Sequence, residues 1–227
     1  DDKGNWPFLI SMLLVTMGGI FVISTLIGVI NNTIVEKLEE LRKGRSRVIE
    51  KDHTVILGWT QEIFTILEEL VITNENKQNP CVVILARKDK IEMEDEIQEK
   101  VGDTRNTRIV CRTGNPLEFN DLLIANLHDS RSVIILSPVE ENPDSEVIKT
   151  LLAIINNPDR RKEPYHTVAV VRDPVNLEVA KMVGRDEVEL LLEDDVISRI
   201  IAQTCRQSGL SVIYKEIHLF LRDFSQW

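Results

Sequence analysis

One uncharged stretch near the start of the chain limits what this sequence can fold into. From Gly4 to Val35 there is no Asp, Glu, Lys or Arg, and from Phe8 onward nearly every residue is apolar. A helix over residues 8–35, at about 1.5 Å per residue, is about 42 Å long and exceeds the ~30 Å hydrocarbon core of a bilayer. We therefore predict a transmembrane helix over residues 8–35, preceded by an extramembrane lead-in of residues 1–7.

A buried core helix and a secretory signal peptide are the alternative interpretations of this stretch. A signal peptide opens with basic residues and has a shorter apolar region, whereas this chain opens with Asp1 and Asp2. Gly18, Gly19 and Gly28 lie within the stretch, where small residues permit bending or close helix packing. They are candidates for a gating hinge, and helix packing is the plainer explanation.

Basic residues gather directly after the apolar stretch, in a connector of residues 36–51. They are Lys37, Arg42, Lys43, Arg45, Arg47 and Lys51. Because the cytoplasmic flanks of membrane helices are rich in Lys and Arg, we expect the rest of the chain on the cytosolic side. Good helix formers and the Glu39–Lys43 pair at i,i+4 spacing predict a helical connector that continues until Gly44 interrupts it. A solvated linker that only fixes topology is the alternative.

The remaining residues, 52–227, alternate short β-branched runs with amphipathic segments. The predicted strands are residues 54–58, 81–86, 108–111, 132–137, 167–171 and 188–192. Such alternation predicts an α/β domain, a doubly wound parallel sheet of the Rossmann type with right-handed crossovers. Three Asx-Pro pairs predict helix starts, because the Asx side chain caps and proline suits the first helical position: Asn115-Pro116, Asn142-Pro143 and Asp173-Pro174.

Charge and cysteine content exclude several classes of protein. Lys and Arg total 27 against 37 Asp and Glu, and a net charge of −10 disfavours binding along a nucleic-acid backbone. Cys81, Cys111 and Cys205 lie far apart, so they form neither a metal knuckle nor a disulfide framework. We therefore expect no nucleic-acid partner and a reducing compartment.

The first predicted strand ends where a dinucleotide-binding fold carries its glycine-rich turn. That turn needs three glycines, but this chain has Gly58, then Thr60 and Ile63, and Trp59 adds bulk. The second strand ends in Arg87 instead of an acidic residue for a ribose hydroxyl. These departures disfavour NAD as a cofactor. A phosphate-bearing ligand contacted by Arg87 and a scaffold that has lost its ligand both stay open.

Residues suited to catalysis are scarce. Arg112 follows the third strand and is a candidate anion contact, with a surface salt bridge as the alternative. The four histidines have no Cys or His partner at ligand spacing, and Ser137 lacks the glycines of a nucleophile elbow. We expect no enzyme activity.

Acidic residues follow two of the predicted strands and are candidate calcium ligands. They are Glu140, Glu141 and Asp144 after the fourth strand, and Glu193, Asp194 and Asp195 after the sixth. Calcium takes several oxygen ligands from flexible loops, although neither cluster has EF-hand spacing. Asp194 or Asp195 is equally well placed to cap the next helix.

A membrane helix, a basic connector and a degenerate Rossmann unit together resemble the inner helix of a tetrameric cation channel leading into an RCK (regulator of K⁺ conductance) domain. Four strings carry a closer resemblance: LRKGRS (41–46), HTVILGW (53–59), IVCRTGNP (109–116) and DDVISRIIAQTCRQSGL (194–210). In this order they resemble the CASTOR/POLLUX family of ion channels, known from plant nuclear envelopes and present in bacteria.

The resemblance implies a ligand-gated cation channel subunit, for potassium or another cation, whose RCK domains form a gating ring. It implies a homotetramer assembled through pore helices and ring, contacts with membrane lipid, and calcium as the regulatory ligand. It also implies that the segment from Asp194 to Leu210 is an interface helix. Family members have further membrane helices, a pore loop and a second RCK unit, so we expect a fragment of a longer channel.

A bacterial plasma membrane or a plant nuclear envelope is the expected location. The alternatives are a membrane-anchored dinucleotide-binding protein, such as an NAD-dependent oxidoreductase, and a regulatory subunit of a potassium-uptake system. The first needs an intact phosphate turn, and the second is usually soluble.

Overall fold

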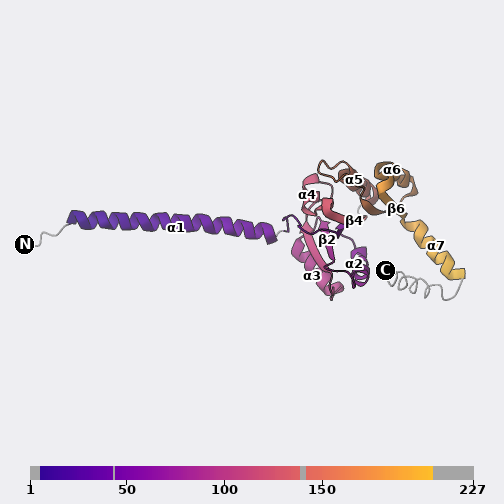
Figure 1. Ribbon diagram of the computed structural model, residues 1–227, viewed down its shortest axis with the longest axis horizontal. Coiled ribbons are helices and arrows are strands. Elements are labelled where there is room, and N and C mark those ends of the chain that lie inside the picture. The colour runs from indigo at the N-terminus through magenta and orange to yellow at the C-terminus, as the bar shows by residue number, and fades with distance from the viewer. Residues whose placement is uncertain (1–5, 43, 139–141, 207–227) are drawn as a thin grey trace, which may run out of the picture. The chain divides into compact units, whose positions relative to one another are not determined.

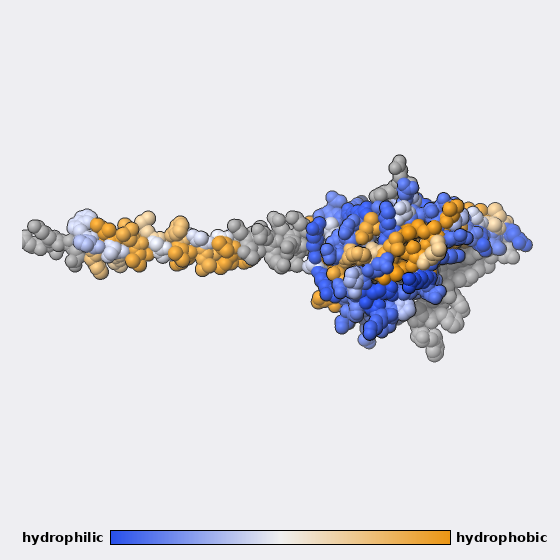
Figure 2. Space-filling view, turned by 90° about the horizontal axis from the view of Figure 1, so that it is seen from above, coloured by the Kyte–Doolittle hydropathy of each residue, from blue (hydrophilic) through white to orange (hydrophobic). Residues whose placement is uncertain are grey.

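The apolar stretch forms one long helix, α1 (Trp6–Arg42), in the computed structural model, which describes residues 6–42, 44–138 and 142–206 (Figure 1). Its segment Trp6–Asn31 is long and apolar enough to cross a membrane, and none of that window is buried within the chain. Figure 2 shows hydrophobic atoms along this helix. A helix that exposes hydrophobic side chains on every side requires lipid or apolar partners around it.

The boundaries of α1 differ from the predicted ones. The helix continues past Val35 and is unbroken at Gly18, Gly19 and Gly28. The connector of residues 36–51 is helical as far as Arg42, and the predicted interruption of this helix at Gly44 is confirmed, since residues 45–51 have no helical backbone. Gly44 has a φ of +67°, a left-handed conformation that ends helices and that glycine adopts without strain.

The rest of the chain, from Lys43 onward, is a second compact unit built on a parallel sheet. Its strands are β1 (His53–Leu57), β2 (Cys81–Ala86), β3 (Arg108–Thr113), β4 (Ser130–Ile135), β5 (His166–Val171) and β6 (Val188–Leu192). They lie in the order β3-β2-β1-β4-β5-β6 and all neighbours are parallel. This confirms the predicted doubly wound Rossmann-like sheet, with strand order reversing between β1 and β4.

Helices cover both faces of this sheet (Figure 1). On one face lie α2 (Glu62–Thr73) and α3 (Lys90–Lys100), and on the other lie α4 (Phe119–Ile124), α5 (Pro143–Ile155) and α6 (Pro174–Gly184). Ile56 of β1 packs in the core cluster under α2 and α3, whereas its neighbours Val55 and Leu57 pack in the opposite cluster. This alternation follows from the period of two in a strand, which buries β1 on both faces.

Two of the three predicted helix starts are confirmed. α5 begins at Pro143 and α6 at Pro174, and the Asp173 carboxylate accepts a hydrogen bond from the Val175 N–H. The prediction for Asn115-Pro116 is wrong, because α4 begins only at Phe119. The Asn115 side chain instead accepts the Leu117 N–H, which gives a local turn in place of a helix cap.

The described chain ends in an amphipathic helix, α7 (Glu193–Arg206), which follows β6 and the short 3₁₀ turn η2 (Arg185–Glu187). None of its residues is buried. Four hydrophobic side chains at i, i+1, i+4 and i+5 spacing are exposed by 40–59%: Val196, Ile197, Ile200 and Ile201. Ser208 and Gly209 of the predicted interface segment lie outside the described residues.

Candidate functional site

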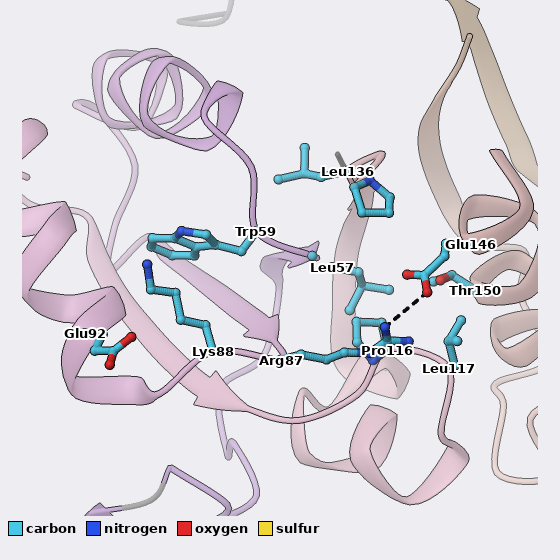
Figure 3. A pocket seen from close by; sticks show the side chains of 12 residues that line it. Leu57, Trp59, Arg87, Lys88, Glu92, Pro116, Leu117, Leu136, Glu146 and Thr150 are labelled. Atoms are coloured by element: carbon cyan, nitrogen blue, oxygen red, sulfur yellow. Dashed lines mark hydrogen bonds and ion pairs between the residues drawn. The ribbon is translucent and has the colours of Figure 1, made fainter. Parts of the chain in front are cut away.

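A cavity of about 390 Å³ lies at the carboxyl ends of β1, β2 and β4. This is the point at which the strand order reverses, where open α/β sheets bind ligands. Its walls are mainly Leu57, Leu136, Pro138, Pro116 and Leu117, and its polar lining residues are Arg87, Lys88, Glu92, Glu146 and Thr150 (Figure 3). An apolar pocket with a few converging polar groups has the general character of a ligand site.

Gly58 forms the turn directly after β1. Its φ is +104°, and a Cβ added there would lie 3.2 Å from the Leu136 carbonyl oxygen. The Gly58 N–H also donates to the Leu85 carbonyl at 2.9 Å, which continues the β1–β2 ladder by one residue. Backbone conformation and lack of space both require glycine here. The first glycine of a dinucleotide turn is therefore present in both sequence and geometry.

The next residue, Trp59, closes one side of the cavity (Figure 3). Its ring packs edge-on against Phe64, with centroids 5.7 Å apart, and the Lys88 ammonium lies 5.0 Å from the Trp59 centroid. Ile63, at the position of the third glycine, is fully buried in the core. The turn is thus filled by side chains where a dinucleotide site needs open backbone.

Arg87 joins three parts of the crevice. Its Nε donates to Asn115 Oδ1 at 2.9 Å, and its Nη1 lies 3.1 Å from Glu146 Oε1 on α5 (Figure 3). Two of the three guanidinium nitrogens, Nε and Nη1, therefore already have partners. An anionic ligand at Arg87 would compete with Glu146, because both present oxygen atoms to the same fork of N–H groups.

Arg112, a candidate anion contact after the third predicted strand, does not lie in the crevice. Its Nε donates to the Ser46 carbonyl oxygen at 2.8 Å, and its Nη1 donates to the Cys111 carbonyl oxygen at 2.8 Å. Desolvation lowers the pKa of this guanidinium. Arg112 does not line the cavity and holds the segment that follows α1.

Asp144, one of the candidate calcium ligands, is buried and accepts hydrogen bonds at both carboxylate oxygens. Its Oδ1 accepts the Arg172 N–H at 2.9 Å, and its Oδ2 accepts from the Asp173 N–H and from Asn176 Nδ2, both at 2.9 Å. Burial raises its pKa, but these hydrogen bonds outweigh burial and the net pKa is lowered. Asp144 ties the start of α5 to the start of α6.

The other candidate calcium ligands have partners or positions of their own. Glu193 Oε2 accepts from Arg172 Nε at 3.0 Å, and Asp195 pairs with Arg199 one turn along α7. Asp194 lies in the first turn of α7. Glu140 and Glu141 lie outside the described residues. Within the part of the chain that the structure describes, no three His, Cys, Asp or Glu side chains come together to hold a metal ion.

His53 and Cys111 are titratable groups buried in the sheet. His53 is fully buried, its Nε2 donates to the Ala125 carbonyl at 3.0 Å, and burial lowers its pKa. Burial raises the pKa of Cys111 to about 12, so its thiol is not ionised at neutral pH. These environments favour neutral core residues over catalytic groups.

Sequence reasoning missed Lys88, Asn115 and Glu146. Glu146 carried a usable signal, because it stands in the first turn of the helix after the fourth strand, at the sheet edge where the crevice forms. Asn115 carried no such signal, because the Asn115-Pro116 pair was interpreted as a helix start.

Comparison with known proteins identifies what this architecture is similar to. Residues 50–163 match the family model described as the calcium-activated potassium channel slowpoke-like RCK domain. The chain is 34% identical over 219 residues to "Probable ion channel CASTOR" from Oryza sativa subsp. japonica, covering 96% of this chain and 24% of that protein. It is 32% identical over 218 residues to "Ion channel DMI1" from Medicago truncatula, covering 96% and 24%.

The chain thus spans about a quarter of the length of these relatives, which are named as ion channels and not as enzymes. The solved structure "Structure of the human SLO3 gating ring" aligns with 70% of this chain and 27% of its own, at 14% identity and a TM-score of 0.47. A likeness of that size says nothing about ligand or activity. The family match shows that this chain belongs to the slowpoke-like RCK domain family.

Proposed function

We propose that this chain is the inner pore helix and first RCK unit of a ligand-gated cation channel. The order of its parts carries the proposal: an exposed apolar helix of membrane-spanning length is followed by an RCK domain whose first strand begins at His53. The basic residues of the connector favour the cytosolic side for this domain. The membrane is a bacterial plasma membrane or a plant nuclear envelope.

The channel is a homotetramer, held together by the pore helices in lipid and by a gating ring of RCK domains. Exposed hydrophobic side chains on two helices support self-association: α7 exposes Ile197 and Ile201, and α6 exposes Val175 by 77% and Met182 by 72%. Figure 2 shows hydrophobic atoms gathered on one face of the domain. Large apolar patches on a soluble surface mark places where another protein surface binds.

Calcium is the regulatory ligand in this proposal. The family description names calcium-activated channels, and the chain carries a net charge of −10 with carboxylates after β4 and β6. Asp144 is the weakest of the six candidate ligands, because its carboxylate already accepts three hydrogen bonds. The remaining candidates are Glu140, Glu141, Glu193, Asp194 and Asp195.

The crevice is a second ligand site, and it does not suit NAD. Trp59 and Lys88 fill the turn, and Ile63 replaces the glycine that lets the helix pack closely against the strand. Titration calorimetry of the chain with NAD and NADH checks this part. Micromolar or tighter binding would contradict it.

The proposal is tested by recording currents from the complete channel polypeptide in planar bilayers while calcium rises from chelated to millimolar. We expect open probability to change with calcium, and Asp194→Asn and Glu141→Gln, measured separately, to shift the response to higher calcium. Asp159→Asn, on an exposed loop, is the matched control and leaves it unchanged. A channel indifferent to calcium contradicts calcium regulation. A calcium response unaltered in both variants contradicts only these ligand residues.

A further inference from the structure

The segment after α1 is bound closely to the RCK domain. We name residues 44–52 the connector strap. The Val48 N–H donates to the Ile124 carbonyl at 2.8 Å, and the Asp52 N–H donates to the Asp129 carbonyl at 2.8 Å. The Val48 side chain is 3% exposed and packs in the hydrophobic cluster that includes Leu122 of α4. The strap is therefore part of the folded domain.

Two side chains of the domain hold the strap by its carbonyl groups. Arg112 Nε donates to the Ser46 carbonyl at 2.8 Å, and Asn126 Nδ2 donates to the Glu50 carbonyl at 3.0 Å. Asn126 has a φ of +51°, a conformation that asparagine tolerates better than most residues. Because both hydrogen bonds go to main-chain carbonyl oxygens, they hold the strap backbone independently of the side chains of Ser46 and Glu50.

Helix α4, which contacts the strap through Ile124, is also linked to the ligand crevice. Arg87 Nε donates to Asn115 Oδ1 at 2.9 Å, and the Asn115 N–H donates to Asp121 Oδ2 at 2.7 Å. Asp121 stands in α4, whose last residue, Ile124, accepts the strap hydrogen bond. One helix of six residues thus has a crevice partner at its start and the strap at its end.

Tight packing allows this region to move as one body. Leu122 is fully buried, and a Cβ added at Gly114 would lie 2.8 Å from the Leu85 side chain and 3.1 Å from Asp121 Cβ. Close-packed interiors transmit displacement instead of absorbing it. A change at Asn115 therefore shifts α4 as a unit.

We propose that residues 115–126 are the coupling element between the crevice and the connector strap. Arg87 is the positioning residue at its crevice end, and Arg112 is a positioning residue that holds the strap itself. An anionic group that replaces Glu146 at Arg87 changes the Arg87–Asn115 hydrogen bond, and α4 transfers this change to the strap. This proposal deepens the proposed channel function. Only the effect of the strap on the pore rests on that function, whereas the coupling within the domain does not.

Hydrogen exchange of the whole chain in lipid nanodiscs tests the coupling without any ligand. In Arg112→Gln we expect strap amides, Val48 above all, to exchange up to about tenfold faster, as for the loss of one hydrogen bond. In Arg87→Gln, whose side chain does not touch the strap, we expect roughly threefold faster exchange in the same peptides. The matched control is Arg172→Gln, which removes the Arg172–Glu193 pair at the end of β5.

The outcomes separate the parts of the proposal. Faster strap exchange in Arg112→Gln and Arg87→Gln, but not in Arg172→Gln, supports it. An effect of Arg112→Gln alone overturns the coupling to the crevice, and no effect in either overturns the coupling element altogether. Faster exchange in all three variants together with a lower melting temperature is general destabilisation and also overturns it. A channel that ignores calcium leaves these exchange results untouched, so failure of the proposed function is recognised separately.

Discussion

Arg87 Nη1 lies 3.1 Å from Glu146 Oε1, so an ion pair joins the end of β2 to α5 across the carboxyl end of β1. The pair spans the crevice of this domain and engages Arg87, one of two cations, with Lys88, that line the cavity after β2. An anion that binds Arg87 at Nη1 therefore competes with Glu146.

Replacement of Glu146 should strengthen anion binding in the crevice. Glu146→Gln removes the competing carboxylate, and an exposed ion pair contributes at most about 1 kcal/mol, so affinity for inorganic pyrophosphate should rise by up to about fivefold. Titration calorimetry measures this change. Glu178→Gln, on α6, is the control and should match the wild type. Equal affinity in all three proteins would argue against an anion site at Arg87.

Gly58→Ala should destabilise the domain by about 1–3 kcal/mol. The new side chain adds left-handed backbone strain and a contact 3.2 Å from the Leu136 carbonyl oxygen. Gly102→Ala is the control, because Gly102 has a φ of +69° but open space around it, so strain acts there without the clash. Urea unfolding followed by circular dichroism should give the larger loss for Gly58→Ala. The reverse order would show that space beside Leu136 is not limiting.

Asp144→Asn should lower the free energy of unfolding by about 1–3 kcal/mol. An amide has only one acceptor oxygen, whereas both carboxylate oxygens accept N–H groups from the start of α6. Asp195→Asn removes only an exposed pair with Arg199 and should cost less than about 1 kcal/mol. Thermal unfolding of both variants checks the difference. If the two losses are equal, the Asp144 carboxylate does not hold α6.

His53 should make stability depend on pH below neutrality. Burial lowers its folded pKa below the ordinary value of 6.5, although the Ala125 carbonyl and the charges of Glu50, Asp129 and Asp52 act in the opposite direction. As pH falls through 6.5 the unfolded chain takes up the proton first. The stabilising effect is therefore complete above that pH and is lost as pH falls toward the folded pKa.

Urea midpoints measured at several pH values between neutral and mildly acidic check this dependence. His53→Gln keeps a donor for the Ala125 carbonyl and should show a flatter pH profile than the wild type. His128→Gln replaces an exposed histidine and serves as the control. An unchanged profile in His53→Gln would assign the pH dependence to other groups.

Ile201→Glu should weaken self-association of the chain. Ile201 is 59% exposed in the apolar stripe of α7, and a buried charge at an interface is costly. Gln203→Glu adds the same charge at an exposed polar position of the same helix and should leave association unchanged. Sedimentation in detergent compares the oligomers. Equal loss in both variants would point to net charge instead of this stripe.

The sequence by itself determined the membrane-type helix, the six strands and the α/β class, because these depend on local hydrophobic period. The length of the uncharged run from Gly4 to Val35 favours a helix, and the shortness and β-branched content of runs such as residues 81–86 favour strands. The defective glycine turn at Gly58 was equally visible, since fingerprint spacing is a local property.

Only the tertiary structure decided what the polar residues contact. Asn115 was predicted to cap a helix but binds Arg87, and Arg112 was predicted in the crevice but holds the Ser46 carbonyl. The Arg87–Asn115 contact joins residues that are 28 positions apart in the sequence, and the Arg112–Ser46 contact joins residues that are 66 positions apart. An arginine side chain is long enough to reach either of two neighbouring surfaces. The choice between the surfaces depends on the packing of α4 and the connector strap against the sheet, which local patterns do not encode.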